Sequence, residues 1–454
     1  MQDFTKGNAA KQILLFSLPM LIGNIFQQFY SMADAFIVGR FVGGGALAAV
    51  GSSMALVNFL IGALIGLTTG ASVVISQCFG AREEEKLKRS VSTSIIFLAG
   101  LSVLISVIGY IFTPVFLRLL DTPPEISDMA VSYLRVILGG ITFPVFYNMY
   151  MAYMRALGNS KSPLYILIFA TILNIGLDVL FVAEFDWGVA GAAWATILSQ
   201  SISMILCIFY ANRYVPLLRI HKFIFDRELF IPILKNSLPA AMQISITSFA
   251  MLTITRLINS FGALAVAGYT AAQRLDMFAM MPLQSLSMAL STFVGQNMGA
   301  GLEQRAKKGF GYTMLFMLVI GVAMSIFVLL LGKGLISLFI NKSDPDAPSI
   351  IIFGTDYLSV ISMFYVFFAV FFSFNGFFRG AGDAVIVMVL TISSLTIRAL
   401  SAYYLAGRFD MGPEAVGWSI PIGWGLCSLV AWFYYAKGFW RNKVAVRSAT
   451  DDVL

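Results

Sequence analysis

The first long apolar stretch of the chain, residues 13–38, contains polar side chains that a membrane helix seldom carries. A helix of ~20 residues at about 1.5 Å per residue crosses the ~30 Å hydrocarbon core, so the stretch is long enough to span a bilayer. Successive helical residues are about 100° apart, which places the polar side chains within an arc of roughly 80°. This polar stripe consists of Asn24, Gln27, Ser31 and Asp34.

The polar stripe cannot face lipid. A carboxylate at the bilayer centre costs about 2.5–3.5 kcal/mol and is found mostly where it faces a bundle interior or a water-filled cavity. The stripe therefore predicts a helix that lines an interior site. The simpler alternative is that Asp34 only forms hydrogen bonds to neighbouring helices.

The composition excludes a soluble globular protein. Apolar residues make up 59% of the chain, charged residues 12%, and the mean hydropathy is +0.84. These values are typical of an all-α integral membrane protein that crosses the bilayer many times. The three cysteines, Cys78, Cys207 and Cys427, lie in or beside apolar segments and have no disulfide or metal-ligand spacing. The first apolar run is too long for a cleavable signal and is expected to remain in the mature protein.

Long apolar segments predict twelve transmembrane helices in two halves. The domains expected are an N-terminal six-helix bundle with its connector (1–225), a C-terminal six-helix bundle (226–436) and a polar cytoplasmic tail (437–454). The expected spans are about 13–38, 46–79, 91–116, 130–154, 164–182, 189–210, 233–258, 271–294, 310–331, 350–378, 384–405 and 416–436.

The two halves share landmarks in the same order at a nearly constant offset. Ser17-Leu18-Pro19 recurs as Ser237-Leu238-Pro239, 220 residues later, and Gln77 recurs as Gln296 at an offset of 219. Further pairs recur at an offset of 224: Arg155 with Arg379, Gly158 with Gly382, Asn159 with Asp383, Gly188 with Gly412, and Trp194 with Trp418. This pattern predicts a duplicated six-helix unit. Because six spans return the chain to its starting side, the repeats are parallel and related by a pseudo-two-fold axis along the membrane normal.

The basic residues predict the orientation in the membrane. Of the 30 Lys and Arg residues, 21 fall on the side of the two termini and the central connector, six fall on the other side and three fall within spans. By the positive-inside rule, both termini are cytoplasmic. We expect a multi-pass protein of the plasma (inner) membrane.

Polar residues in the fifth and sixth spans complete a candidate site with the first. Asn174 and Asp178 are one helical turn apart, and Thr196 lies in the helix that follows a short turn. If they meet Asp34, their oxygens would suit Na⁺, because hard cations prefer carboxylate, amide and hydroxyl ligands. Two carboxylates close together in a low dielectric also repel each other, which favours proton binding. The sequence leaves Na⁺ and H⁺ both open.

The second half lacks these groups. The positions equivalent to Asp34, Asn174, Asp178 and Thr196 are Ile254, Arg398, Ala402 and Ile420. A polar site required by the fold would be expected twice, so the asymmetry favours a functional site in the first half. Other candidates for a cavity lining are Asn24, Gln27, Tyr30, Ser31, Tyr147, Asn148 and Asp276.

Motifs of other function classes are missing. The chain has no GxxxxGK[ST] loop, and its single histidine, His221, has no ligand spacing around it. We therefore expect no enzyme activity, no cofactor beyond a coupling ion, and no nucleic-acid partner. The expected partners are the lipid bilayer and small molecules, and the expected state is a monomer.

The whole chain resembles the multidrug and toxic compound extrusion (MATE) family. The matching segments are SLPMLIGNIFQQFYSMADAFIVGRFVG, SQCFGAREEEKLKRS, RALGNSKSP, LDVLFV and FDWGVAGAAWAT in the first half, with VGQNMGAG, FRGAGDA and FDMGPEAVGW in the second. The resemblance implies two six-helix bundles and export of cationic or amphipathic drugs against inward H⁺ or Na⁺. Asp34, Asn174, Asp178 and Thr196 match the branch of the family whose cation site lies in the N-terminal bundle.

Two alternatives remain from the sequence. A flippase for a lipid-linked precursor would need cationic residues in the cavity, and the first half offers only Arg135 within a span. An uncoupled channel or scaffold would show no dependence on an ion gradient.

Overall fold

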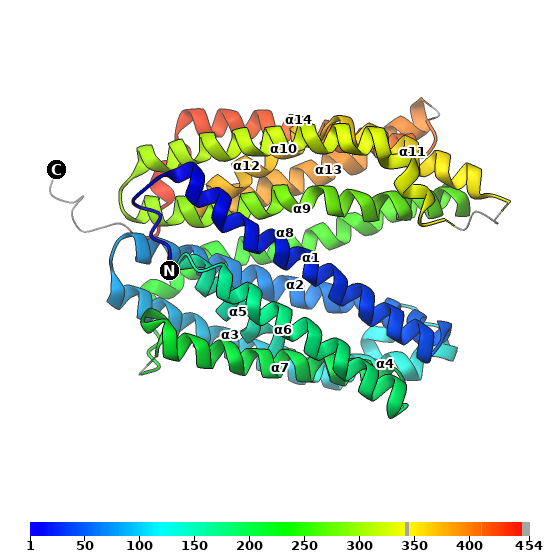
Figure 1. Ribbon diagram of the computed structural model, residues 1–454, viewed down its shortest axis with the longest axis horizontal. Helices are drawn as coiled ribbons and strands as arrows, with labels where there is room; N and C mark the ends of the chain where they lie inside the picture. The colour runs from blue at the N-terminus through cyan, green and yellow to red at the C-terminus, as the bar shows by residue number, and fades with distance from the viewer. Residues whose placement is uncertain (221, 341–344, 410, 447–454) are drawn as a thin grey trace. The chain divides into compact units, whose positions relative to one another are not determined.

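The computed structural model describes residues 1–220, 222–340, 345–409 and 411–446, apart from the side chain of Ala55, and this part of the chain contains helices and no strand (Figure 1). His221, Asp410 and residues 447–454 of the expected tail lie outside the described residues. The first-half helices are α1 (Ala9–Phe41), α2 (Gly44–Gly80), α3 (Glu84–Leu119), α4 (Pro124–Gly139), α5 (Thr142–Ala156), α6 (Lys161–Asp178), the π-helix η1 (Val179–Glu184), α7 (Gly188–Tyr214) and the 3₁₀ turn η2 (Pro216–Leu218). The second-half helices are α8 (Arg227–Ser260), α9 (Ala263–Gly299), α10 (Glu303–Ser337), α11 (Ala347–Met363), α12 (Tyr365–Ala381), α13 (Ala384–Arg408), α14 (Glu414–Lys437) and the 3₁₀ turn η3 (Phe439–Lys443).

The helices account for up to twelve membrane spans. Ten are long and apolar enough to cross a bilayer alone, and two bent pairs bring the number to twelve. The bent pairs are α4 with α5, at 47°, and α11 with α12, at 54°. They correspond to the fourth and tenth expected spans, so the same span is broken in both repeats. Gly139 and Gly140 lie at the first break, where glycine weakens a helix. The second break, at Phe364, has neither glycine nor proline.

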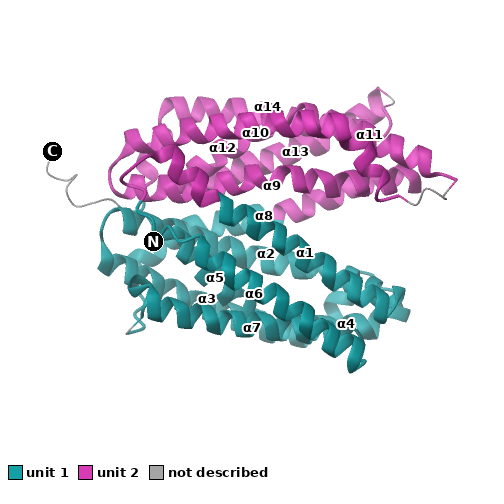
Figure 2. Cartoon of the chain, in the orientation of Figure 1, with its two compact units in different colours: residues 1–3, 18–245, 445–454 teal, residues 4–17, 246–444 magenta. Residues whose placement is uncertain are grey.

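The described helices form two compact units, coloured separately in Figure 2. Among the described residues, unit 1 contains 1–3, 18–245 and 445–446, and unit 2 contains those within 4–17 and 246–444. The divisions fall within α1 and α8, the first helix of each repeat, and not in the connector at residue 225. The first turns of α1 therefore pack in unit 2, while the remainder of α1, with Asp34, packs in unit 1.

The loop after α5 and the loop after α12 have the same local structure, as the repeat predicts. Gly158 and Gly382 both adopt a left-handed backbone, with φ of 77° and 89°, which glycine tolerates best. The next residue then caps the following helix: Asn159 Oδ1 accepts from the Ser162 N–H at 3.1 Å, and Asp383 Oδ1 accepts from the Ile386 N–H at 3.4 Å. This shared geometry explains why these positions recur in the sequence.

We expect Asn159→Ala to lower the stability of the protein by about 1 kcal/mol, because the first turn of α6 would lose its cap. Asn159→Asp should retain nearly full stability, since a carboxylate oxygen can accept the same bond from Ser162. Thermal unfolding in detergent measures both variants. Equal melting temperatures for Asn159→Ala and wild type would contradict this role.

A very close helix approach organises unit 1. A Cβ atom on Gly70 of α2 would lie 2.3 Å from the Cα of Ser237 in α8, and one on Gly66 would lie 2.5 Å from the Cα of Ala241. Ser237 Oγ also donates to the Leu67 carbonyl at 2.7 Å. Small residues permit this backbone contact, the usual way in which membrane helices pack tightly.

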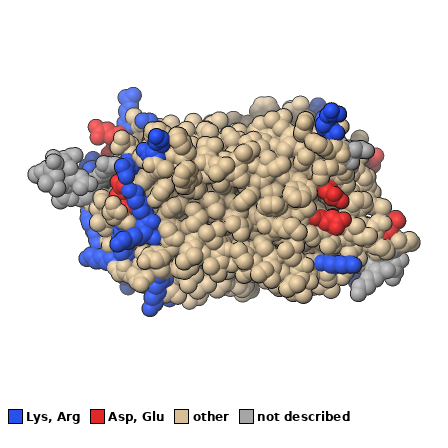
Figure 3. All heavy atoms as spheres, turned by 90° about the horizontal axis from the view of Figure 1, so that it is seen from above, with Lys and Arg blue, Asp and Glu red and all other residues tan. Residues whose placement is uncertain are grey.

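Charged side chains are sparse between the two ends of the helices. On the face seen in Figure 3, Lys and Arg gather mostly at one end, and a wide band without charged side chains separates it from the other end. This band is where the apolar spans lie, as expected for helices that cross hydrocarbon. Part of the expected tail is folded, because η3 follows α14 and buries Trp440 within unit 2.

Candidate cation-binding site

The polar stripe of α1 lines a cavity inside unit 1. Gln27, Tyr30, Ser31 and Asp34 all face this space, which has a volume of about 430 Å³. Residues of α2, α4, α5 and α7 form the other walls, including Tyr133, Tyr147, Asn148, Thr196 and Gln200. Three of the four stripe residues, Gln27, Ser31 and Asp34, therefore line this cavity, and Asp34 is the buried one, while Gln27 and Ser31 are exposed.

Asp34 is the carboxylate of this cavity. Its side chain is buried, with 8% of the residue exposed, and its Oδ1 atom has no hydrogen-bond partner among the described residues. Burying a carboxylate oxygen without a partner is costly, so such an atom is a candidate ligand for a cation or a proton.

The end of α6 supplies a second set of polar atoms without partners. Asn174 and Asp178 are fully buried and lie one turn apart, at the point where α6 continues into the π-helix η1. Both side-chain polar atoms of each residue lack a hydrogen-bond partner among the described residues. Neither residue is among those that line the cavity with Asp34. Single π turns within helices occur frequently at functional sites.

Tyr30 connects α1 with α7. Its hydroxyl donates to Thr196 Oγ1 at 3.4 Å, and both residues line the cavity with Asp34. Thr196 thus lines the same cavity as Asp34.

The chemistry of this donor set suits a small hard cation. The carboxylate, amide and hydroxyl oxygens of Asp34, Asp178, Asn174 and Thr196 are the ligand types that Na⁺ accepts. Among the described residues, no group of three His, Cys, Asp or Glu side chains could hold a metal ion. Two carboxyl groups and two neutral oxygen groups are also residue types that accommodate a proton.

Other sequence-predicted residues lie in different places. Tyr147 and Asn148 line the cavity, and Asn148 Nδ2 donates to the Pro144 carbonyl at 2.8 Å. Asn24 lies on α1 about one turn before Gln27, and it is not among the residues that line the cavity. Asp276 belongs to unit 2, where its carboxylate accepts a hydrogen bond from the Tyr365 hydroxyl at 2.8 Å.

Arg135, the basic residue that the flippase alternative requires, lines a separate cavity of about 620 Å³ with Tyr110 and Trp194. Its guanidinium carbon lies 5.6 Å from the centre of the Tyr110 ring. The cavity that contains Asp34 has no Arg or Lys among its lining residues.

Three polar residues of this lining, beyond those predicted from the sequence, are Asn58, Tyr133 and Gln200. Gln200 lies one turn after Thr196 on α7, and its Oε1 atom is buried without a partner among the described residues. Asn58 and Tyr133 contribute from α2 and α4. The four-residue spacing of Thr196 and Gln200 within an apolar helix is the signal that could have identified Gln200.

Comparison with known proteins assigns the family. The model of the MatE family matches residues 19–180 and 239–404, once in each half. The chain belongs to the MATE family of multidrug efflux transporters. It is 35% identical over 443 residues to the probable multidrug resistance protein YpnP of Bacillus subtilis (strain 168), covering 97% of each chain. It is 30% identical over 352 residues to the probable multidrug resistance protein YoeA of the same strain, covering 76% of each.

The fold of this MATE transporter is also that of solved relatives. A transporter of the MOP superfamily from Pyrococcus furiosus Vc1 (DSM3638) superposes with a TM-score of 0.88 at 26% sequence identity, covering 96% of this chain and 97% of that one. The expected all-helical membrane fold and transport class are thereby confirmed.

Proposed function

We propose that this MATE protein is a secondary antiporter that exports cationic or amphipathic drugs and xenobiotics in exchange for inward Na⁺ or H⁺. The coupling ion binds Asp34, Asn174, Asp178 and Thr196 in the N-terminal bundle. One observation carries this proposal: Asp34 Oδ1, both carboxylate oxygens of Asp178 and the amide oxygen of Asn174 are buried without a hydrogen-bond partner among the described residues.

Buried polar atoms in native proteins are nearly always satisfied. Four oxygens without partners on three residues, all predicted from the sequence as one site, are better explained by a bound ion than by packing. The branch of the family that couples through the C-terminal bundle is less well supported, since residues 233–258 contain no Asp or Glu. These observations support a coupling site in the first half.

Coupling requires that the ion and the drug favour different conformations. A ligand shifts an equilibrium only by its difference in affinity between the two states, and the resulting effect on a second ligand is reciprocal. Asp34 can meet this requirement because it lies on α1. Pro19 removes a backbone hydrogen bond within this helix, whose first turns pack in unit 2 and whose remainder packs in unit 1. The bundles at residues 1–225 and 226–436 are proposed as the moving halves, with both termini in the cytoplasm, in a monomer of the plasma membrane.

The coupling is tested with purified protein in liposomes. Efflux of a fluorescent cation is measured while a Na⁺ gradient and a pH gradient are imposed separately. The ion whose gradient drives efflux is the coupling ion. Equal rates with and without both gradients would exclude an antiporter and favour an uncoupled channel.

Thr196→Val tests a neutral ligand of the site. Valine has nearly the same shape but no oxygen, so we expect about a tenfold higher half-saturating concentration of the coupling ion, equal to about 1.4 kcal/mol. Maximal drug efflux at saturating ion should remain. Thr196→Ser retains the hydroxyl, so its half-saturating ion concentration should stay close to that of the wild type. An unchanged half-saturating concentration in Thr196→Val would show that Thr196 is not a ligand of the ion.

A further inference from the structure

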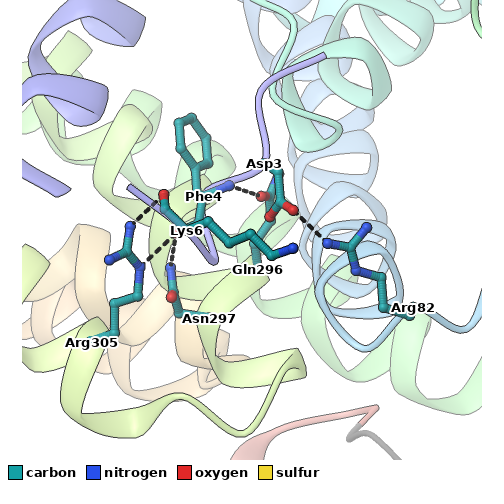
Figure 4. Close-up of polar contacts among 7 residues, drawn as sticks. All are labelled: Asp3, Phe4, Lys6, Arg82, Gln296, Asn297 and Arg305. Carbon is teal, nitrogen blue, oxygen red and sulfur yellow. Dashed lines mark hydrogen bonds and ion pairs between the residues drawn. The ribbon is translucent and has the colours of Figure 1, made fainter. Parts of the chain in front are cut away.

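The segment before α1 is bound by side chains of unit 2. Phe4 is fully buried, and its backbone N–H donates to Gln296 Oε1 at 3.0 Å. Its carbonyl accepts from Asn297 Nδ2 at 3.2 Å and from Arg305 Nε at 2.8 Å. Figure 4 shows the three side chains converging on this one residue. Both backbone groups of Phe4 are thus held.

Arg305 extends this contact toward the start of α1. Its Nη2 atom donates to the Lys6 carbonyl at 2.8 Å and to Gln12 Oε1 at 3.1 Å. The fork geometry of a guanidinium allows this spread of donors, which a lysine could not reproduce. One side chain therefore binds the segment before α1 and the first turn of α1 together.

Aromatic packing completes the binding of Phe4. Its ring centre lies 5.0 Å from that of Phe16 and 5.7 Å from that of Phe293, and the Arg305 guanidinium carbon lies 5.5 Å from the Phe293 ring centre. Burial of a Phe side chain contributes about 1.5–3 kcal/mol. We call Gln296, Asn297 and Arg305, with Phe293, the Phe4 docking site.

The repeat-related position binds the other end of the chain. Gln77 is the equivalent of Gln296, and its Oε1 atom accepts from the backbone N–H of Ala445 at 2.8 Å and of Val446 at 3.4 Å. In both units, the same glutamine accepts a backbone hydrogen bond from a terminal segment. This repetition indicates that the glutamine is a docking residue and not an incidental contact.

The anchor just before Phe4 is weaker. Asp3 forms an ion pair with Arg82, and their side chains are 30% and 60% exposed. The neighbouring Gln2 N–H donates to the Gly158 carbonyl at 3.0 Å. Exposed ion pairs contribute about 0–1 kcal/mol. The buried Phe4 docking site is therefore the stronger of the two anchors, and the start of α1 stays with unit 2.

We propose that Gln296, Asn297 and Arg305 are positioning residues for transport. They fix the segment 4–8 and the first turns of α1, so that the helix carrying Asp34 is held at its start by unit 2 and beyond residue 17 by unit 1. Binding of the coupling ion at Asp34 then acts on a continuous helix whose start is bound by side chains of unit 2. This inference rests on the proposed coupling site, and its test separates the two.

Hydrogen exchange measured by mass spectrometry on the full-length protein in detergent tests the docking. In Gln296→Ala/Arg305→Ala, we expect the amides of residues 4–12 to exchange at least about tenfold faster than in wild type, because the acceptor for the Phe4 N–H is lost. Gln296→Glu keeps an oxygen acceptor and should retain protection. Lys308→Ala is the matched control, because Lys308 is exposed and lies on α10, the helix that carries Arg305. Unchanged exchange in the double variant would overturn the docking.

Ion-driven efflux tests the positioning role. In Gln296→Ala/Arg305→Ala, we expect the half-saturating concentration of the coupling ion to change by at least about threefold, with Lys308→Ala unchanged and Arg305→Lys rescuing only in part. A lower maximal rate with the same half-saturation would indicate a purely structural role and overturn the proposal. If wild type shows no ion dependence, the coupling site and the positioning role both fail, while hydrogen exchange still decides whether the segment is docked.

Discussion

Asp178→Asn and Asp34→Asn are each expected to abolish ion-driven drug efflux at physiological ion concentrations. Each replacement removes a negative charge from a buried carboxyl: Asp34 Oδ1 and both carboxylate oxygens of Asp178 have no hydrogen-bond partner among the described residues. Removing one partner of a buried ionic interaction costs about 3–5 kcal/mol. At about 1.4 kcal/mol per tenfold, the coupling ion should bind at least about 100-fold more weakly.

The measurement is efflux of a fluorescent cation from liposomes, driven by the ion gradient that drives the wild type. Asp128→Asn, which neutralises an exposed carboxylate of the same half, is the matched control and should transport normally. Melting temperatures exclude misfolding, and asparagine should not lower them, because it relieves the burial of a charge. Normal ion-driven efflux in both variants would contradict the proposed coupling site.

Gly70→Ala is expected to destabilise the protein more than any other single methyl addition in α2. The new Cβ would lie 2.3 Å from the Cα and N atoms of Ser237, and these are backbone atoms that cannot move aside without separating α2 from α8. Overpacking of this kind costs about 1–3 kcal/mol. The Ser237 hydrogen bond to the Leu67 carbonyl would be strained at the same time.

Thermal unfolding in detergent measures this effect, with Gly51→Ala as the control. Gly51 lies in the same helix, and a Cβ there would meet nothing within 4 Å. Since alanine favours a helix over glycine by about 1 kcal/mol, Gly51→Ala should be neutral or stabilising. Equal melting temperatures for the two variants would contradict the close packing of α2 on α8.

The membrane fold and much of the candidate site follow from sequence patterns of short range. The period of the helix placed Gln27, Ser31 and Asp34 on one face, and the structure has them lining one cavity. The repeat predicted that Gly158 and Gly382 play the same part, and both adopt a left-handed backbone. These features depend on local geometry, which the order of residues encodes directly.

Features that depend on contacts between distant segments were not predictable in this way. The break at Phe364 has no glycine or proline to mark it, so only the packing of α11 and α12 reveals it. Asn58 of α2 and Tyr133 of α4 line the cavity with Asp34 of α1, and no spacing along the chain relates the three. The same holds for Gln77 and Gln296, whose recurrence was visible in the sequence while their partners at the two termini were not.

The Phe4 docking site also sets a condition on the biosynthesis of the protein. Phe4 and Arg305 are 301 positions apart, so Phe4 is synthesised well before the α9 and α10 residues that bind it. At ~5–20 residues per second, that interval is roughly 15–60 s. During this interval, the Phe4 side chain, which precedes α1, lacks the residues that bury it, and the docking site forms only after α9 and α10 have been made.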